Sequence, residues 1–196
     1  IPPLSAPTFG LIQESLRSEP FWLLVACSLL NKTNSRSALP IFHTLKTTYP
    51  TPEDIISADE ETIKEMLRPL GLFNKRAKTL KDLAGEWVEH PPQRGKRYKV
   101  KDYPDTGDHN GNAAHPNGTN THPPSEENCK GALEIGHLPG CGRYAYDAWR
   151  IFCRDELRFS GGVVIGEPEW KRVNPQDKEL RAYVKWLWAK EGVVWD

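Results

Sequence analysis

A glycine-rich turn in the C-terminal half of the chain has the residue types that bind a phosphate. Residues 138–143 read Leu-Pro-Gly-Cys-Gly-Arg and lead directly into a helical pattern. Gly140 and Gly142 can adopt positive φ, so their backbone N–H groups can turn outward with no Cβ in the way. With the N-terminus of the following helix, these groups form a candidate anion site that could approach a nucleic-acid phosphate closely. The alternative is a glycine turn that only caps a helix.

A second stretch offers a carboxylate at the start of a predicted helix. Residues 173–178 read Val-Asn-Pro-Gln-Asp-Lys, which predicts a helix with Asn174 as its cap, Pro175 at its first position and Asp177 in its first turn. An ionised carboxylate at such a position can stabilise a developing positive charge and can orient or deprotonate a water molecule. The alternative is that Asp177 only interacts favourably with the helix dipole.

The elements that must position these two stretches are predicted to be helices. An apolar stripe at helical spacing predicts a helix directly after the glycine turn. Its members are Ala145, Ala148, Trp149 and Phe152. Residues 132–136 predict a short helix before the turn, which Gly136 closes. Helix, glycine hairpin and helix in this order make a helix-hairpin-helix.

Apolar periodicity predicts further helices along the rest of the chain. They begin at Thr8, Pro20, Ser37, Thr51, Ser57, Asn74 and Asn174. Residues 21–31 are apolar on nearly every side, which predicts a buried central helix. Strand-like alternation is nearly absent, so the sequence predicts an all-α fold.

Two irregular insertions interrupt the predicted helices. Residues 105–130, in the longer insertion, contain no large hydrophobic side chain, so we expect a solvated loop there. The histidines of this loop match no metal-ligand spacing, and no metal site is expected. The shorter insertion is glycine-rich and could hold a small hairpin. The single domain over residues 1–196 thus divides into a helical core (8–90), a long insertion (91–130), the helix-hairpin-helix (131–157), a short insertion (158–172) and the helix that carries Asp177 (173–190).

The composition limits the class of protein. The chain has 196 residues with 26 basic and 26 acidic side chains, and a net charge near zero argues mildly against a nucleic-acid-binding protein. A basic run at residues 94–101 could contact phosphate or form the solvated edge of a loop. No apolar run reaches the ~20 residues needed to cross a bilayer. The four cysteines lack Cys-x-x-Cys spacing, which argues against a zinc site and favours a reduced, intracellular protein.

Taken together, these motifs resemble one known family. The run Leu-Pro-Gly-x-Gly-Arg at residues 138–143 is similar to the hairpin of the helix-hairpin-helix DNA glycosylase superfamily, in which a catalytic aspartate begins a later helix. Within that superfamily, the chain resembles most the thymine/uracil mismatch glycosylase domain that animals fuse to a methyl-CpG-binding domain. The matching runs are residues 11–16, 30–33, 68–73, 76–79, 144–147, 150–153, 173–178 and 186–188.

The resemblance implies a role for several residues near the reacting base. Asp177 would be the catalytic carboxylate, and Tyr144 would line the base pocket beside it. Gln13 would form hydrogen bonds with the pyrimidine edge of the flipped base, since its amide offers both a donor and an acceptor. Ile12 would form part of the pocket wall, and Leu72 would enter the DNA helix beside the orphaned guanine.

The resemblance also implies contacts with the DNA backbone and the vacated stack. Lys32 stands where the relatives have an arginine that fills the hole left by the flipped nucleotide, and lysine fills and stacks less well. Further DNA-binding residues would be Gly140, Gly142, Arg143 and Lys178. The backbone carbonyls of Leu138 and Cys141 could hold a monovalent cation in the hairpin.

Tyr144 bears on the type of reaction. In the bifunctional branch of the superfamily this position is a lysine, whose amine attacks the sugar to form a Schiff base. Tyrosine cannot form a Schiff base, so the resemblance implies a hydrolase without lyase activity. The alternative is that Tyr144 is merely an aromatic side chain that packs on its helix. The C-terminal four-cysteine array of the endonuclease III branch is missing, so no iron–sulfur cluster is expected.

We therefore expect a monofunctional DNA glycosylase of base excision repair. It would flip thymine or uracil mispaired with guanine out of the duplex and hydrolyse its N-glycosidic bond without a cofactor. The expected partner is double-stranded DNA that contains a mismatch, with no membrane, and the expected protein is a nuclear monomer. Two alternatives stay open. One is a non-catalytic DNA-binding module in which Asp177 only caps a helix, and the other is a glycosylase for another damaged base.

Overall fold

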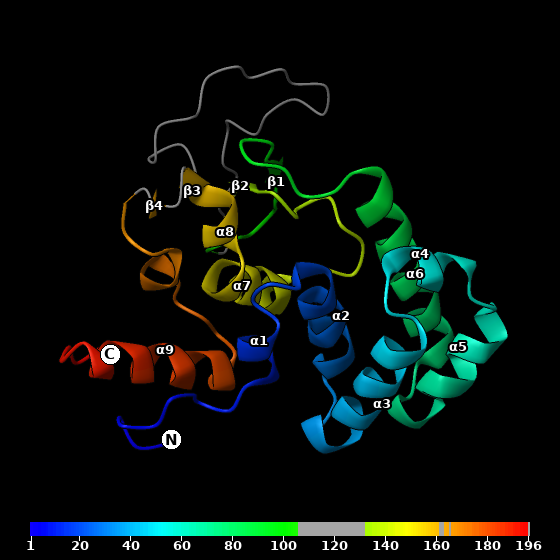
Figure 1. Cartoon of the computed structure of the whole chain (residues 1–196), viewed down its shortest axis with the longest axis horizontal. Helices are drawn as coiled ribbons and strands as arrows, with labels where there is room; N and C mark the ends of the chain where they lie inside the picture. Colours follow the sequence, from blue (N-terminus) through cyan, green and yellow to red (C-terminus); the bar gives the residue numbers. More distant parts are fainter. Residues whose placement is uncertain (106–131, 161–162, 165, 196) are drawn as a thin grey trace.

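Helices make up most of the described chain (Figure 1). The computed structural model describes residues 1–105, 132–160, 163–164 and 166–195. In these residues the α-helices are α1 (Ile12–Ser15), α2 (Pro20–Leu30), α3 (Ser35–Thr48), α4 (Pro52–Ser57), α5 (Glu60–Leu67), α6 (Phe73–Glu89), α7 (Arg143–Phe152), α8 (Arg154–Arg158) and α9 (Lys178–Lys190). Short 3₁₀ helices are η1 (Arg68–Leu70) and η3 (Glu169–Arg172). The short strands are β1 (Tyr98–Lys99), β2 (Ala132–Leu133), β3 (Phe159–Ser160) and β4 (Val163–Val164). The predicted all-α class is confirmed.

Helix α2 lies at the centre of the hydrophobic core, as its apolar sequence predicts. Residues 21–27 and Leu29 are buried, and Pro20 occupies the first helical position. α2 packs against α3, α6 and α7, and Figure 1 shows α3–α6 on one side of it and α7–α9 on the other. Full burial of each large apolar side chain contributes about 1.5–3 kcal/mol. α2 therefore joins the two sides of the molecule.

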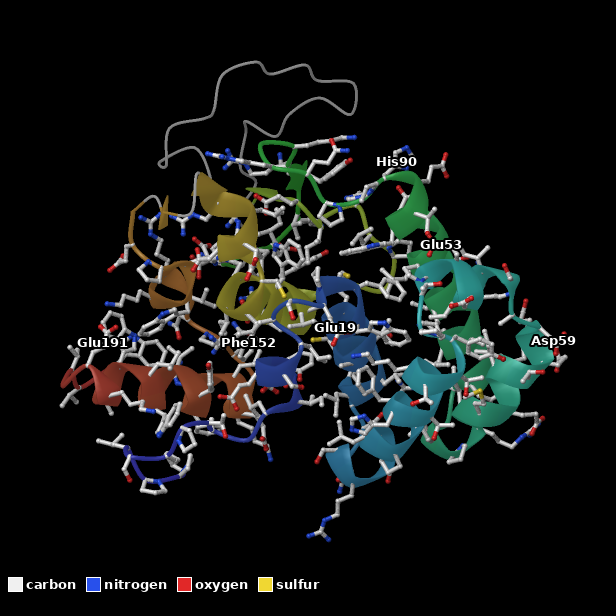
Figure 2. All side chains as sticks on the ribbon, viewed as in Figure 1. Glu19, Glu53, Asp59, His90, Phe152 and Glu191 are labelled. Carbon is white, nitrogen blue, oxygen red and sulfur yellow. The ribbon has the colours of Figure 1, made fainter. Side chains whose placement is uncertain are left out.

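Aromatic side chains bring the N-terminal segment, α7 and α9 together. Phe152, the last residue of α7 (Figure 2), has its ring centroid 5.0 Å from that of Tyr183 on α9. Phe9, just before α1, packs edge-on against Tyr183 with centroids 5.6 Å apart. These contacts place the start of α1 close to α7 and α9.

Side-chain caps explain where several helices begin. The Thr51 hydroxyl accepts a hydrogen bond from the Asp54 N–H and the Asp54 carboxylate accepts one from the Thr51 N–H, so a capping box begins α4 at the predicted residue. Asp59, at the outer end of α5 (Figure 2), caps that helix. Asn34 caps α3, which therefore begins at Ser35, earlier than predicted.

Helix α1 begins at Ile12, not at Thr8 as predicted. Gly10 has a φ of +104°, which is outside the helical region. The Glu14 carboxylate accepts hydrogen bonds of 2.7–3.0 Å from the backbone N–H groups of residues 9–11. These bonds satisfy three backbone donors outside any helix, and the positive φ of Gly10 prevents a helix from running through it, so α1 starts only at Ile12.

The helix predicted over residues 132–136 is absent. Instead, β2 pairs antiparallel with β1 in the long insertion, and tight turns follow it. Gly136 lies so close to β1 that a Cβ would be 2.8 Å from Val100 Cγ2 and 2.9 Å from the Tyr98 carbonyl oxygen. Because the segment docks on β1, its backbone groups pair across strands and turns rather than within a helix. The hairpin and α7 follow as predicted.

The two insertions are partly packed on the core. Val100 and Tyr103 are buried, so the part of the long insertion that precedes the predicted solvated loop packs on the core. Residues 106–131, with Cys129 and the loop histidines, lie outside the described residues. In the short insertion, β3 and β4 form the small antiparallel hairpin that the glycines predict. Within the described residues, no helix is both long and apolar enough to cross a membrane.

Replacement of Gly140 should destabilise the hairpin. Gly140 has a φ of +76°, and a Cβ there would lie 2.3 Å from Thr79 Cγ2 of α6. We expect Gly140→Ala to lower the free energy of unfolding by about 2–4 kcal/mol, from backbone strain and steric overlap. Gly142→Ala is the matched control, because no atom lies within 4 Å of its added Cβ, and it should cost about 1 kcal/mol or less. Urea denaturation measures both, and equal losses would contradict the contact with Thr79.

Candidate functional site

A cleft of about 540 Å³ lies between α1, the loop after α2, α7 and the start of α9. Residues far apart in the sequence line it, namely residues 10–13, residues 30–35 with Leu39, Tyr144, and residues 177–180. Of the residues with predicted roles, the structure brings six together here, namely Ile12, Gln13, Lys32, Tyr144, Asp177 and Lys178. Leu72 and the glycines of the hairpin do not line the cleft.

Asp177 is the N-cap of α9 rather than a residue of its first turn. Its Oδ1 accepts hydrogen bonds from the backbone N–H groups of Glu179 (2.9 Å) and Leu180 (3.0 Å). Asp177, and not Asn174, therefore sets the start of the helix, which begins at Lys178. Oδ2 takes no part in this cap. The cap orients one oxygen and leaves the carboxylate at the cleft.

A buried amide and a phenol face each other in the same cleft. Gln13 is only 2% exposed, and its Nε2 donates a hydrogen bond of 2.7 Å to the Tyr144 hydroxyl. Burial raises the pKa of Tyr144, and the neighbouring Cys27 and Asp177 raise it further. Burial likewise raises the pKa of the Cys27 thiol, which lies beside Gln13. The phenol and the thiol are therefore neutral, and Gln13 keeps a carbonyl oxygen for another partner.

Lys32 and Leu72 have unusual backbone conformations. Their φ values are +57° and +50°, in the left-handed region that costs a non-glycine residue about 1–2 kcal/mol. Lys32 is exposed at the cleft, and Leu72 is 73% exposed before α6. Leu72 is thus an exposed hydrophobic side chain in a strained turn. This combination is typical of a residue that contacts a binding partner.

The hairpin differs from the prediction at one glycine. Gly140 has the predicted positive φ, but Gly142 has φ −131° and ψ −169°, because it is the extended N-cap of α7. The Arg143 guanidinium donates hydrogen bonds to the carbonyl oxygens of Asp102 and Pro104, so it faces the long insertion. The Leu138 carbonyl accepts a hydrogen bond from the Cys141 N–H at 3.4 Å.

The basic run of residues 94–101 is not a uniformly solvated edge. Arg97 is only 9% exposed, and the Lys96 ammonium lies 5.7 Å from the centre of the Tyr98 ring. Tyr98 in turn stacks on His137, with ring centroids 3.9 Å apart. Part of this run is thus packed against the protein and not directed to solvent.

Sequence reasoning missed a buried acid on α7, Asp147. Its Oδ1 accepts a hydrogen bond of 2.7 Å from the Tyr103 hydroxyl, which also accepts one of 3.4 Å from Arg150 Nη1. Burial raises the pKa of Asp147 to about 6, although Tyr103, Arg150, Arg143 and the backbone N–H of Gln176 all act to lower it. Asp147 therefore links α7 to the long insertion and to the residue before Asp177. The sequence signal was a carboxylate among the otherwise uncharged residues 144–149.

Buried ion pairs attach the short insertion to α7 and α8. Arg150 Nε lies 2.5 Å from Glu169 Oε1, and Arg154 Nη1 lies 2.8 Å from the same oxygen. Arg154 Nε is also 3.1 Å from Glu134 Oε2, and Arg154, Glu134 and Glu169 are each less than 10% exposed. The removal of one partner would leave a buried charge unpaired, so the network holds η3 in one position.

Glu179 is a second carboxylate in the cleft that the sequence did not single out.

Comparisons with known proteins identify the class. Residues 25–190 match the family model described as "HhH-GPD superfamily base excision DNA repair protein". The fold is all-α, and the glycine hairpin leads into α7 next to the cleft. The chain belongs to the HhH-GPD superfamily of base excision DNA repair proteins, a family of DNA glycosylases.

Individual relatives are similar over different lengths. A thymine-DNA glycosylase of Aeropyrum pernix is 36% identical over 94 residues, which is 47% of this chain and 42% of that protein. The methyl-CpG-binding domain protein 4-like protein of Arabidopsis thaliana is 26% identical over 187 residues, which is 95% of this chain and 30% of that protein. The solved structure of a thermostable thymine-DNA glycosylase has a TM-score of 0.49 and 20% identity, and the match covers 77% of this chain and 54% of that one. The chain thus spans less than half the length of these curated relatives.

The buried Asp147 should make stability depend on pH. Its folded pKa of about 6 lies above the ordinary value of 3.8, so the folded state binds the proton more tightly than the unfolded state does. Stability from this group is therefore present at low pH and falls as the pH rises from about 4 to about 6. We subtract the unfolding free energy of Asp147→Asn from that of the native chain. This difference should be about 2 kcal/mol larger at pH 4.5 than at pH 7.5.

Urea denaturation at several pH values measures this difference. Tyr103→Phe provides a companion variant, because loss of its hydrogen bond removes one factor that lowers the pKa of Asp147. In Tyr103→Phe the pKa of Asp147 should therefore be higher, and the fall in stability should extend to higher pH. A difference between the native chain and Asp147→Asn that is the same at all pH values would contradict a buried carboxyl that titrates near pH 6.

Proposed function

We propose that this protein is a monofunctional DNA glycosylase that removes thymine or uracil mispaired with guanine. The observation that carries the proposal is the meeting of Asp177, Gln13 and Tyr144 in one cleft, although they come from three distant parts of the sequence. The names of the relatives, thymine-DNA glycosylase and methyl-CpG-binding domain protein 4-like protein, support the same substrate class.

The target base must leave the duplex before Asp177 can act on its sugar. A base inside the stack is out of reach of a side chain in a cleft, and a mispaired pyrimidine costs less to extrude than a paired one. Lys32 at the cleft would fill the space that the flipped nucleotide vacates, and the exposed Leu72 would enter the DNA helix beside the orphaned guanine. The energy of these contacts would offset the cost of unstacking.

Asp177 would act on the sugar of the flipped nucleotide. As the glycosidic bond breaks, positive charge develops on the sugar ring, and a fixed carboxylate stabilises that charge. The two bonds to Oδ1 hold the group in place, so that no reorganisation is needed during the reaction. The same carboxylate would orient the water molecule that completes the hydrolysis.

Gln13 would recognise the base by its hydrogen-bonding edge. One amide hydrogen is committed to the Tyr144 hydroxyl, which fixes the direction of the side chain. The carbonyl oxygen can accept from the N3–H of thymine or uracil, and the second amide hydrogen can donate to a base carbonyl. Cytosine has an acceptor at N3 and its donor at N4, so it could pair with this amide only in a shifted position.

Tyr144 would make the enzyme a hydrolase without lyase activity. A lyase of this superfamily needs an amine nucleophile that forms a Schiff base with the sugar. The neutral phenol of Tyr144 cannot form one, and its hydroxyl instead accepts the hydrogen bond from Gln13. The product would be an intact strand with an abasic site.

The proposal also covers the cofactors, the bound ion, the DNA partner and the location of the protein. Hydrolysis of the glycosidic bond by a carboxylate and water requires no redox cofactor. The Leu138 and Cys141 carbonyls would hold a monovalent cation at the hairpin, where it would add positive charge near the backbone of Gly140 and Gly142. Mismatched duplex DNA is the proposed substrate, and we infer a monomer that acts in the nucleus. Lys178, exposed at the start of α9, would contact a phosphate.

A second function is a DNA-binding module without catalytic activity. The observation in its favour is that Asp177 already has a structural role, since Oδ1 caps α9. A test must therefore separate the cap from the chemistry. Asparagine caps helices about as well as aspartate, so Asp177→Asn keeps the cap and removes the charge.

Single-turnover excision tests the two functions. We expect the native chain to act on T:G and U:G pairs more than on T:A or C:G pairs, and Asp177→Asn to be at least about 100-fold slower. Glu179→Gln is the matched control, because it removes another carboxylate of the same cleft. It should change the rate by about threefold or less, since Glu179 has no assigned contact with the reacting atoms.

The product distinguishes the reaction types. Strand breaks should form only after alkali treatment, and borohydride should trap no covalent complex between protein and DNA. A native chain that binds these duplexes but removes no base would favour the DNA-binding module. Equal losses in Asp177→Asn and Glu179→Gln would contradict the assignment of Asp177.

A further inference from the structure

Two exposed loops share a strained backbone conformation and lie on either side of one guanidinium. Lys32 follows α2 and Leu72 precedes α6, and both have positive φ. Such conformations persist only where the surrounding structure holds them. Arg76, in the first turn of α6, donates hydrogen bonds to both loops.

The bonds of Arg76 reach around Lys32 and behind Leu72. On the α2 side, its two terminal nitrogens donate to four oxygens. These are the carbonyl oxygens of Ser28 (2.9 Å), Leu29 (3.4 Å) and Asn31 (3.3 Å), and Thr33 Oγ1 (2.6 Å). On the α6 side, Nε donates to the carbonyl oxygen of Gly71 at 3.1 Å. One planar group thus connects the residues on both sides of Lys32 with the residue just before Leu72.

Several of these contacts need an arginine. The last carbonyls of α2 have no partner within the helix, and a positive charge at that end interacts favourably with the helix dipole. A guanidinium has five N–H donors in a rigid plane, whereas the three donors of a lysine sit on one flexible atom. A lysine could neutralise the end of α2 but could not reach Thr33 and Gly71 from opposite edges at the same time.

The two loops differ in what they face. Asn31 and Thr33, which Arg76 binds, line the cleft together with Lys32. Leu72 is outside the cleft and exposed. Arg76 itself is half-buried between them and does not line the cleft. Arg76 therefore connects the loop that lines the cleft to the loop that carries the exposed side chain of Leu72.

We propose that Arg76 is a positioning residue that holds Lys32 and Leu72 in one fixed arrangement, and that this arrangement selects the base opposite the one removed. The second part rests on the proposed glycosylase function. If Lys32 fills the vacated stack while Leu72 packs beside the opposite base, the distance between them decides which opposite base fits. A displacement of about 1 Å in such an arrangement is enough to weaken recognition strongly.

Hydrogen exchange of the free protein tests the first part without reference to activity. The N–H groups of Asn31, Thr33 and Gly71 are hydrogen-bonded to backbone carbonyls of neighbouring residues and report on the two loops. We expect Arg76→Lys, which keeps the charge, to speed exchange in both loops about tenfold. Lys75→Ala, which removes an exposed charge from the same helical turn, should leave both unchanged. Faster exchange in one loop alone, or in neither, would overturn the coupling.

The ratio of excision rates on U:G and U:A duplexes tests the second part. We expect this ratio to fall about tenfold in Arg76→Lys and to stay constant in Lys75→Ala. A variant that is merely less folded loses activity on both duplexes in parallel, which lowers the rates but leaves the ratio unchanged. An unchanged ratio in Arg76→Lys, with a selective native chain, would overturn the role in selection while the glycosylase function stands. A native chain that excises neither base would overturn selection together with the proposed function, and the exchange result would still decide the coupling.

Discussion

The burial of α2 is the constraint on which the rest of the structure depends. Because this helix is apolar on nearly every side, it must be covered by other helices all round, and α3, α6 and α7 do so. Its C-terminal end leads into residues 30–35, which line the cleft, and the carbonyl oxygens of its last turn need partners. Arg76 and the turn around Lys32 provide them. One wall of the cleft is thus formed where the central helix of the core ends.

Asp177 combines a structural and a chemical requirement in one side chain. As the N-cap it is held by the backbone of α9, and α9 is held by the buried side chains of Leu180, Tyr183 and Val184. A carboxylate that is fixed in this way stabilises a developing positive charge better than a mobile one, because no free energy is needed to reorient it during the reaction. The cap is therefore compatible with either function, and only the effect of its charge separates them.

Both insertions make polar contacts with α7, the helix that carries Tyr144 into the cleft. The long insertion contributes Tyr103, and the short insertion contributes Glu169, and both contact the buried face of α7 through Asp147 and Arg150. α7 carries Tyr144 at its start, and the Asp147 carboxyl faces the backbone N–H just before Asp177. Segments that are irregular in sequence thus contribute buried polar contacts beside the cleft. Such contacts are satisfied only in one arrangement, which makes them specific rather than strongly stabilising.

The sequence by itself determined the local features of this protein. The apolar run of α2, the proline and capping signals of α2 and α4, and the positive φ of Gly140 all depend on neighbouring residues and were predictable from spacing and residue type. The family motifs also indicated Gln13, Tyr144 and Asp177, which meet in one cleft. Only the tertiary structure decided which of Asn174 and Asp177 caps α9, that residues 132–136 pair with a distant strand, and that Arg143 turns toward the long insertion. It alone revealed Asp147 and Arg76 as connecting residues. The physical reason differs between them: Asn174 and Asp177 both have side chains that cap helices, so spacing alone allows two starts for α9. The other features depend on partners remote in sequence, and hydrogen bonds between remote residues leave no periodicity to read.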